Sequence, residues 1–473
     1  MPDGFLSPVS AHQTRSPEGM RTIPCTALDL TAALVVFTTG LVIDTRLDTS
    51  KLQGSLFELV EHKFPRAGAR LALRNGAYEF VIPHIFDANN PPVAFTSEDF
   101  PEPYRSSGRP ELPIHLSDAF DSATPSIHPL PPALDEYLWS RECPTSLDGF
   151  LVPNTPVIHV RVTTFQDLTF IGLTASHITL DAVGVRTLLH AWTLLLSGEP
   201  IDSIQGMEWD AQPFKVFMGS AAATTQTLGG VPEPGLVVEH SCVPKVTTFI
   251  VRVPKAFLDD SSREINQSLQ LRGSGEWVGS SDVLLAWWFK TTYSYRTIDD
   301  ETSIHIHIPT DLRGMCIFPG PSALEDHDPY IHNATSLISV PPIPANGFHT
   351  ESLAELALRI RRSVTASQED LDGITAQLRM ACANPSIPRF PNAPGSEHSL
   401  QSNWRKARFR ELDFSGACKR TAHVVLVLGP IPSTPAPGLG IICMEDDHAL
   451  WMCQTRTRTH WDNIRRSGIV AFI

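Results

Sequence analysis

The chain has 473 residues, of which 42% are hydrophobic and 19% are charged. This composition is typical of a globular protein, and the length exceeds what one ordinary hydrophobic core holds, so we expect two domains. The 37 basic and 51 acidic residues give a net charge of −14. Because phosphates repel an acidic protein, this charge argues against nucleic acid or an anionic membrane surface as a partner.

The cysteines and the apolar runs argue against a disulfide-rich, zinc-binding, secreted or membrane-spanning protein. The eight cysteines are scattered and none forms a C-x-x-C pair, so we expect neither a disulfide framework nor a zinc site, but reduced thiols in a cytoplasmic protein. The first residues lack the basic and apolar regions of a secretory signal. The most apolar run, 32–43, is shorter than the about 20 residues that a membrane helix needs, so it predicts a buried strand.

The first part of the chain alternates strands and helices. After the strand at 33–42, apolar residues at spacings i, i+4, i+7 and i+8 from Leu52 predict a helix with Asp48 or Thr49 as its cap. A hairpin is expected at 71–82, since Asn75-Gly76 is the strongest short turn signal. The Pro-rich region 83–155 is expected to be mostly loop.

The stretch 157–200 has the most regular pattern. Two apolar, Thr-rich runs, 157–165 and 168–176, predict a hairpin whose second strand ends at His177. From Asp181 to Leu196 the apolar residues follow one helical face, which Ser197-Gly198-Glu199-Pro200 closes. The pattern therefore puts an imidazole at the end of a strand, beside a carboxylate that opens a helix.

The remaining chain predicts a second α/β part. Residues 201–245 contain Pro and Gly with little periodicity and predict a crossover linker. Beyond it we expect a strand at 247–253, helices near 254–270 and 281–295, a strand at 304–309 and a helix opened by the capping box Ser352-x-x-Glu355. The Pro-rich stretch 384–400 predicts a surface loop, and the last 70 residues predict short strands and turns. The expected division is 1–205, 206–245 (linker) and 246–473.

His177-x-x-x-Asp181-Ala-x-Gly184 resembles the signature of the BAHD acyltransferases, a CoA-dependent family that includes plant and fungal secondary-metabolite acyltransferases. A second match, His307-Ile-Pro-Thr-Asp311, has Pro309 inside it and is followed by neither Ala-x-Gly nor a helix. The context therefore favours His177.

Further stretches are similar to the family in the right order. The segments 311–313 and 330–334 resemble its D-x-R-x-R and Y-F-G-N-A region, 281–287 resembles the helix that opens its second half, and 56–82 looks like its fungal branch. Asp413-Phe-Ser-Gly-Ala417 resembles D-F-G-W-G but departs from it at the third, fourth and fifth positions. Met315 stands where the family often has a second Arg. These departures leave the histidine in place and bear on donor geometry.

The resemblance implies an α/β fold of two chloramphenicol-acetyltransferase-like domains, each a mixed sheet with flanking helices, with the active-site channel at their interface. It implies His177 as catalytic base, Asp181, Arg313 and Gly184 as structural residues near the site, and an ion pair between Asp181 and Arg313. The donor-site vicinity would contain four residues of the late segment: Asp413, Phe414, Ser415 and Gly416. A monomer that binds acyl-CoA, most simply acetyl-CoA, and a small hydroxylated acceptor is expected, without a bound cofactor or membrane span.

The residues themselves are compatible with this chemistry. An imidazole with a pKa near 6.5 is largely neutral at pH 7 and can take a hydroxyl proton and return it to a thiolate. Asp181 could orient the imidazole as in a triad, but its position across a strand-to-helix turn favours the structural role. His305-x-His307 lacks a third metal ligand at a suitable spacing, so we expect no metal.

Two other functions remain open at this point. One is a transferase of the same H-x-x-x-D superfamily that takes its acyl group from a carrier protein, as condensation domains do. The other is a non-catalytic binding protein on the same fold, which the altered 413–417 segment suggests.

Overall fold

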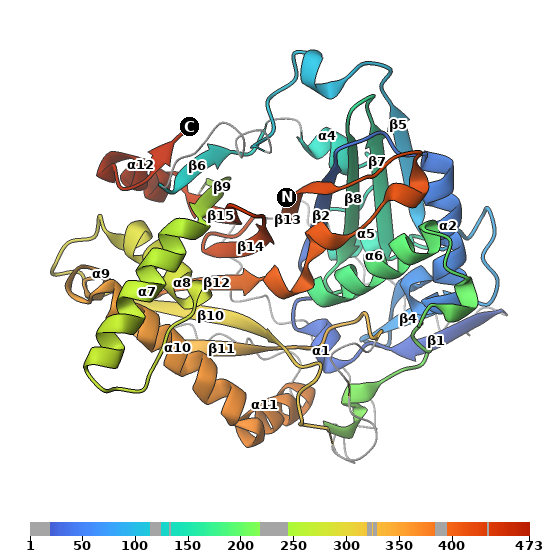
Figure 1. The fold of residues 1–473 in the computed structure, drawn as a ribbon. Helices are drawn as coiled ribbons and strands as arrows, with labels where there is room; N and C mark the ends of the chain where they lie inside the picture. The colour runs from blue at the N-terminus through green and yellow to red at the C-terminus, as the bar shows by residue number, and fades with distance from the viewer. Residues whose placement is uncertain are drawn as a thin grey trace, which may run out of the picture.

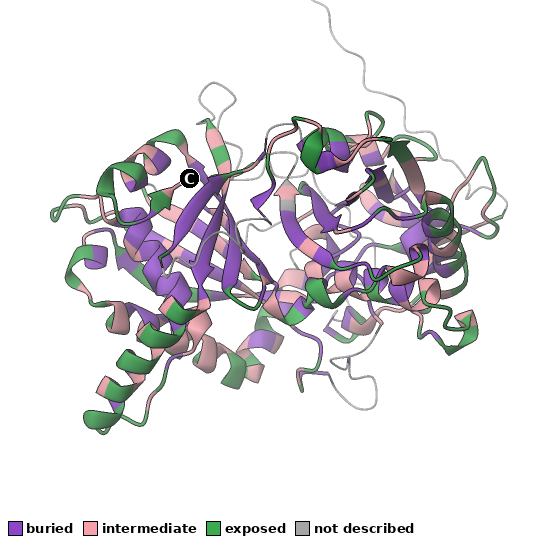
Figure 2. Ribbon diagram, turned by 45° about the horizontal axis from the view of Figure 1, so that its top comes forward, coloured by how far each residue is buried: buried purple, intermediate pink, exposed green. Residues whose placement is uncertain are grey.

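The computed structural model of the protein describes residues 19–113, 124–131, 134–217, 245–318, 324, 329–383, 395–432 and 435–473. Within these residues, two large β-sheets lie side by side, and helices cover their outer faces (Figure 1). Buried residues concentrate in the strands of both sheets, whereas the outward sides of the helices are exposed (Figure 2).

The first large sheet carries the strand that leads to His177. Its five strands lie in the order β13-β2-β8-β7-β5, and every residue of β2 and β8 is buried. Burial on both faces explains why their sequences are continuously apolar or Thr-rich instead of alternating. Their bounds are β2 Val36–Ile43, β5 Ala94–Asp99, β7 Ile158–Thr164, β8 Thr169–Ser176 and β13 Val424–Pro432.

Two long helices, α2 (Thr49–Lys63) and α6 (Ala182–Leu196), pack together and share the core of this sheet. The side chain of Asp48 caps α2 by accepting hydrogen bonds from the backbone N–H groups of Ser50 and Lys51, which satisfies donors that have no partner within the helix. Shorter helices are α1 (Ala27–Leu30), α4 (Leu134–Leu138) and α5 (Leu147–Phe150). A small sheet in the order β1-β4-β3 joins Met20–Pro24, Ala77–Pro83 and Arg70–Arg74.

The second large sheet has eight strands in the order β11-β10-β12-β14-β15-β9-β6-β16. Its helix-covered face buries Ile304, Ile306 and Ile308 in a core of its own. The strands are β6 Ser126–Pro129, β9 Val246–Pro254, β10 Ser303–Asp311, β11 Thr335–Pro344, β12 Glu397–Asn403, β14 Leu439–Glu445, β15 Ala449–Thr457 and β16 Ala471–Phe472. The helices are α7 Lys255–Leu271, α8 Ser280–Tyr293, α9 Gly347–Thr350, α10 Leu353–Glu369, α11 Leu371–Ala383 and α12 Arg458–Ser467.

Each large sheet contains a strand from the other part of the chain. β13 pairs antiparallel with β2 of the first sheet, and β6 pairs antiparallel with β9 of the second. The division at 1–205 and 246–473 stays a prediction, and most of the expected linker, 218–244, lies outside the described residues.

Several predicted elements are confirmed. The hairpin β3–β4 turns at Asn75 and Gly76, whose φ angles of 50° and 78° are those of the expected tight turn. The β7–β8 hairpin, α6 and the capping box of α10 are also present.

The region 83–155 is mostly loop in its described residues, as expected, but it also contributes β5 and β6, each to a different sheet. Two other expectations were wrong in part. β12 begins inside the expected loop 384–400 and lies between β10 and β14, and 384–394 lie outside the described residues. The last part of the chain contains the helix α12 as well as strands. None of the helices in the described ranges has the length and apolar character to cross a bilayer.

Candidate active site

The turn after β8 holds His177. The backbone N–H of His177 donates to the carbonyl of Val35 at 2.7 Å, and that of Thr179 donates to the carbonyl of Ser176 at 2.8 Å. The imidazole is half-buried and packs against Phe37 with the ring centroids 5.1 Å apart. The strand end therefore fixes the position of this side chain.

Asp181 closes the same turn and caps α6. Its Oδ1 accepts from the backbone N–H of Gly184 at 2.7 Å, and its Oδ2 accepts from that of Ala334 at 2.9 Å. Both carboxylate oxygens also accept from the guanidinium of Arg313, at 3.1 and 3.2 Å. The ion pair that the resemblance implies is thus present, buried and bidentate, a geometry that makes such pairs strong and directional.

Arg313 ties three segments together. Besides Asp181, it donates to Asp311 at 2.8 Å and to the backbone carbonyls of Tyr330 and His332. Burial alone would lower the pKa of the guanidinium, but the carboxylates of Asp181 and Asp311 raise it above its usual value. Arg313 therefore stays charged inside the protein, and this geometry favours the structural role of Asp181 over the triad.

The segment 330–334 packs directly on the turn that holds His177. The ring Nδ1 of His332 donates to the carbonyl of Thr179 at 2.6 Å. A Cβ at Gly184 would lie 1.7 Å from the carbonyl oxygen of Ile331, so this close approach requires glycine at the first turn of α6. The glycine of the H-x-x-x-D-A-x-G pattern thus has a packing role.

Asn333 is a site residue that sequence reasoning missed. Its Oδ1 lies 3.0 Å from Nδ1 of His177, and its Nδ2 donates to the backbone carbonyls of His177 and Ile178 at 2.7 and 3.2 Å. The signal was its place in 330–334, which resembles Y-F-G-N-A, but the resemblance gave it no role.

The environment of His177 keeps the imidazole neutral. Burial lowers the pKa of His177 below its usual value, while the ring's contact with its own backbone carbonyl, the charge of Asp181 and the hydrogen bond of Asn333 oppose this shift. A neutral imidazole near pH 7 has a lone pair with which to accept a proton.

The residues 413–416 lie at the other end of α6. A Cβ at Gly416 would lie 1.9 Å from the carbonyl oxygen of Leu196, and the ring of Phe414 meets Trp192 edge-on at 5.8 Å. The Oδ1 of Asp413 accepts from the backbone N–H of Ser415 at 2.9 Å. From Asp181 to Leu196, α6 spans roughly 20 Å, so these residues do not contact His177. Their assignment to the donor vicinity stays a prediction.

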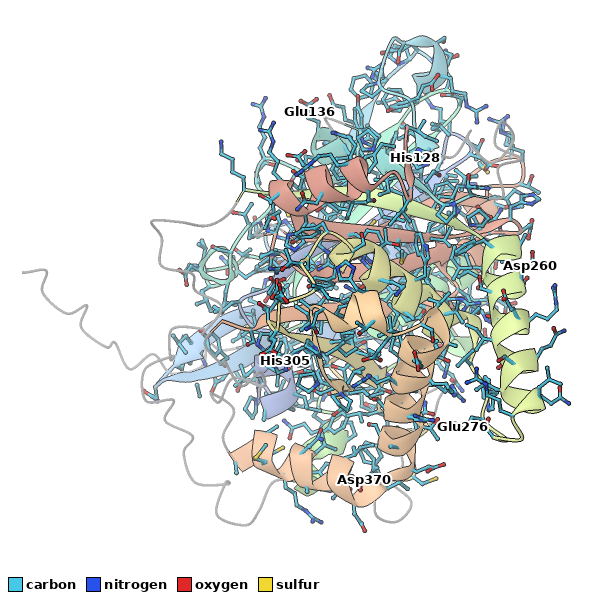
Figure 3. All side chains as sticks on the ribbon, turned by 90° about the vertical axis from the view of Figure 1, so that its left-hand side faces the viewer. His128, Glu136, Asp260, Glu276, His305 and Asp370 are labelled. Atoms are coloured by element: carbon cyan, nitrogen blue, oxygen red, sulfur yellow. The ribbon has the colours of Figure 1, made fainter. Side chains whose placement is uncertain are left out.

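His305 and His307, the pair considered as metal ligands, form a stack with His398. His305, on β10 and labelled in Figure 3, and His307 stack on His398 at centroid distances of 4.5 and 5.4 Å. The nitrogens of His307 face Ser339 and His398, each at 3.1 Å. In the described part of the chain, no group of three or more His, Cys, Asp or Glu residues has the geometry of a metal site.

Several known proteins are similar to the chain over most of its length. The chain is 29% identical over 402 residues to acetyltransferase adrJ of Penicillium roqueforti, covering 80% of this chain and 78% of that protein. It is 27% identical over 414 residues to acetyltransferase pyiB of Pyricularia grisea, with 82% and 78% covered. A protein named transcriptional regulator calD, of Penicillium decumbens, is 25% identical over 419 residues, with 84% and 81% covered. No protein-family model matches the chain.

Solved structures share the fold. TRI101 of F. sporotrichioides, complexed with coenzyme A and T-2, matches with a TM-score of 0.64 at 14% identity, covering 93% of this chain and 96% of that one. Vinorine synthase matches with a TM-score of 0.62 at 15% identity, covering 97% and 96%. The predicted fold of two chloramphenicol-acetyltransferase-like domains is confirmed. The named homologues support an acyltransferase family and an acyltransferase enzyme.

Proposed function

We propose that this protein is an acyl-CoA-dependent O-acyltransferase, in the simplest case an O-acetyltransferase, and that His177 is its general base. The observation that carries the proposal is the half-buried, neutral imidazole of His177, held at a strand end beside the buried ion pair of Asp181 and Arg313. The names of the homologues support acetyl transfer. The TRI101 complex with coenzyme A and T-2 supports a CoA donor and a small acceptor.

The same comparison supports a class of acceptor. We propose a hydroxyl on a small secondary metabolite, such as a terpenoid or a polyketide. Phe37, which packs against the ring of His177, is apolar, which suits a hydrophobic acceptor. We further propose that the protein acts as a cytoplasmic monomer.

The reaction would proceed directly between the two bound substrates. His177 takes the proton of the acceptor hydroxyl as its oxygen attacks the thioester carbonyl carbon. The tetrahedral intermediate then expels the thiolate of CoA, which receives the proton from the imidazolium, so the ester and the free thiol leave together. No acyl group is attached to the enzyme at any stage.

Release of free thiol from acetyl-CoA, in the presence of pooled terpenoid and polyketide alcohols, tests the proposal. We expect acceptor-dependent release by the wild type and a loss of about 10²- to 10⁴-fold in His177→Ala. His62→Ala is the matched control, because His62 is exposed in the last turn of α2. Equal release by wild type and His177→Ala would refute the role of His177.

A non-catalytic role is the second candidate, because one relative of similar coverage is named a transcriptional regulator. Binding of acceptors without turnover, unaffected by His177→Ala, would favour it. Turnover with a carrier-bound acyl thioester but not with acetyl-CoA would instead point to a condensation-type transferase.

A further inference from the structure

We infer that Asn333 and Asp29 form a positioning pair that fixes the tautomer of His177, so that Nδ1 carries the hydrogen and Nε2 is the atom that takes the acceptor's proton. The inference rests on the proposed function and deepens it by naming the two groups that hold His177 in one tautomer.

The amide of Asn333 can have only one orientation in its surroundings. One side of the amide faces three acceptors: the backbone carbonyls of His177 and Ile178, and Oδ1 of Asp29 at 3.5 Å. None of these atoms can donate a hydrogen bond when Asp29 is ionised, so the NH₂ group must lie on this side. A flipped amide would put its carbonyl oxygen against two carbonyls and a carboxylate, with its own donors unsatisfied in a buried site.

This orientation decides the state of His177. With Nδ2 committed to the three acceptors, Oδ1 of Asn333 faces Nδ1 of His177 at 3.0 Å. An amide oxygen only accepts, so Nδ1 must carry the hydrogen. In a neutral imidazole the lone pair then lies on Nε2, for which the described residues offer no hydrogen-bond partner.

Asp29 is itself held in place. It is buried in the first helix, α1, where its Oδ2 accepts from the backbone N–H and the hydroxyl of Thr26 at 2.7 and 2.8 Å. This capping box leaves Oδ1 to face Asn333. The pair therefore connects the N-terminal helix, the segment 330–334 and the catalytic turn, three segments that are far apart in the sequence.

The test reads the tautomer directly. Ring ¹⁵N chemical shifts of His177, assigned by difference with His177→Gln in ¹⁵N-histidine-labelled protein, should show hydrogen on Nδ1 in the wild type above the pKa of the imidazole. In Asn333→Ala we expect a mixture of the two tautomers and a fall in kcat of about 10²-fold with the KM for acetyl-CoA unchanged. In Asp29→Asn, where one weak acceptor is replaced, the expected fall is about 3- to 10-fold.

Asn333→Asp is the conservative variant. Its carboxyl keeps an acceptor at Nδ1, while its second oxygen faces the two carbonyls and Asp29, so we expect that oxygen to carry a proton and to donate it in a hydrogen bond. The tautomer should therefore be retained, and kcat should lie nearer to the wild-type value than that of Asn333→Ala. Asn266→Ala is the control for structural loss, since the side chain of Asn266 on α7 also bridges two backbone groups, the N–H and the carbonyl of Val278 in the loop before α8.

The outcomes separate the two proposals. If Asn333→Ala keeps hydrogen on Nδ1 and full kcat, the histidine's own backbone carbonyl suffices and the inference is overturned. If Asp29→Asn has the wild-type tautomer and the wild-type kcat, Asp29 does not help to fix the tautomer of His177, and the inferred pair is refuted. If the wild type shows the expected tautomer but transfers no acyl group to any acceptor, the proposed function fails while the positioning pair stands.

Discussion

At its N-terminal end α6 presents Gly184 to the carbonyl oxygen of Ile331, and at its C-terminal end it presents the carbonyl oxygen of Leu196 to Gly416. At both ends, therefore, α6 contacts a later part of the chain where a glycine lies against a backbone carbonyl oxygen. The ends differ in their polar groups. Asp181 is buried among Arg313 and backbone donors, whereas Asp413 is exposed and accepts from the backbone of Ser415. The close packing is therefore common to both ends, whereas the buried charge network occurs only at the end near His177.

The largest expected effect is that of breaking this buried network. In Asp181→Asn we expect the free energy of unfolding to fall by about 3–5 kcal/mol, because Arg313 loses its buried counter-charge and keeps only the partly exposed Asp311. Urea unfolding at neutral pH and the yield of folded protein measure this. A midpoint and yield equal to those of the wild type would contradict the structural role of Asp181.

Adding one methyl group at each end compares the two glycine contacts. Gly184→Ala and Gly416→Ala should each destabilise the protein by about 1–3 kcal/mol, because the new Cβ displaces a backbone carbonyl. Only Gly184→Ala should also reduce kcat of the folded enzyme, since Ile331 lies two residues from Asn333. Gly54→Ala is the control: Gly54 lies on α2 with no atom near the added Cβ, so we expect a gain of about 0.5–1 kcal/mol.

The smallest effect is expected at the exposed carboxylate. Asp413→Asn should cost at most about 1 kcal/mol of stability at neutral pH, since it weakens hydrogen bonds that Ser415 donates to an exposed carboxylate. The hydrogen bonds from Ser415 hold the pKa of Asp413 below its usual value. Its contribution is therefore present above the unfolded-state pKa and is lost as the pH falls through the lower folded-state pKa. The urea midpoints of the wild type and Asp413→Asn should differ slightly at neutral pH and become equal in acid. A loss of stability as large as that of Asp181→Asn would contradict the difference between the two ends of α6.

The local features of the site could be predicted because they depend on neighbours in the sequence. The strand before His177, the cap at Asp181 and the turn at Asn75-Gly76 follow from periodicity and turn chemistry. The ion pair of Asp181 with Arg313 followed only from a resemblance, because no local pattern joins residues so far apart.

The long-range partners could not be predicted from patterns. Asn333 and Asp29 meet His177 only after both sheets have formed, and neither residue type signals such a contact by itself. β6 and β12 were missed for the same reason, and the pairing of β13 with β2 was not predicted. Short strands that contain Pro or polar residues resemble loops until a partner strand is known.

The exchange of β6 and β13 between the large sheets has a consequence for engineering. A chimaera joined in the linker would separate β13 from the β2 of its own parent and β6 from its own β9. The new partner strands would then have to match in register across two unrelated sequences. Recombination between relatives should therefore transfer each of these strands together with the sheet that receives it, which requires crossover points on both sides of residues 126–129 and 424–432.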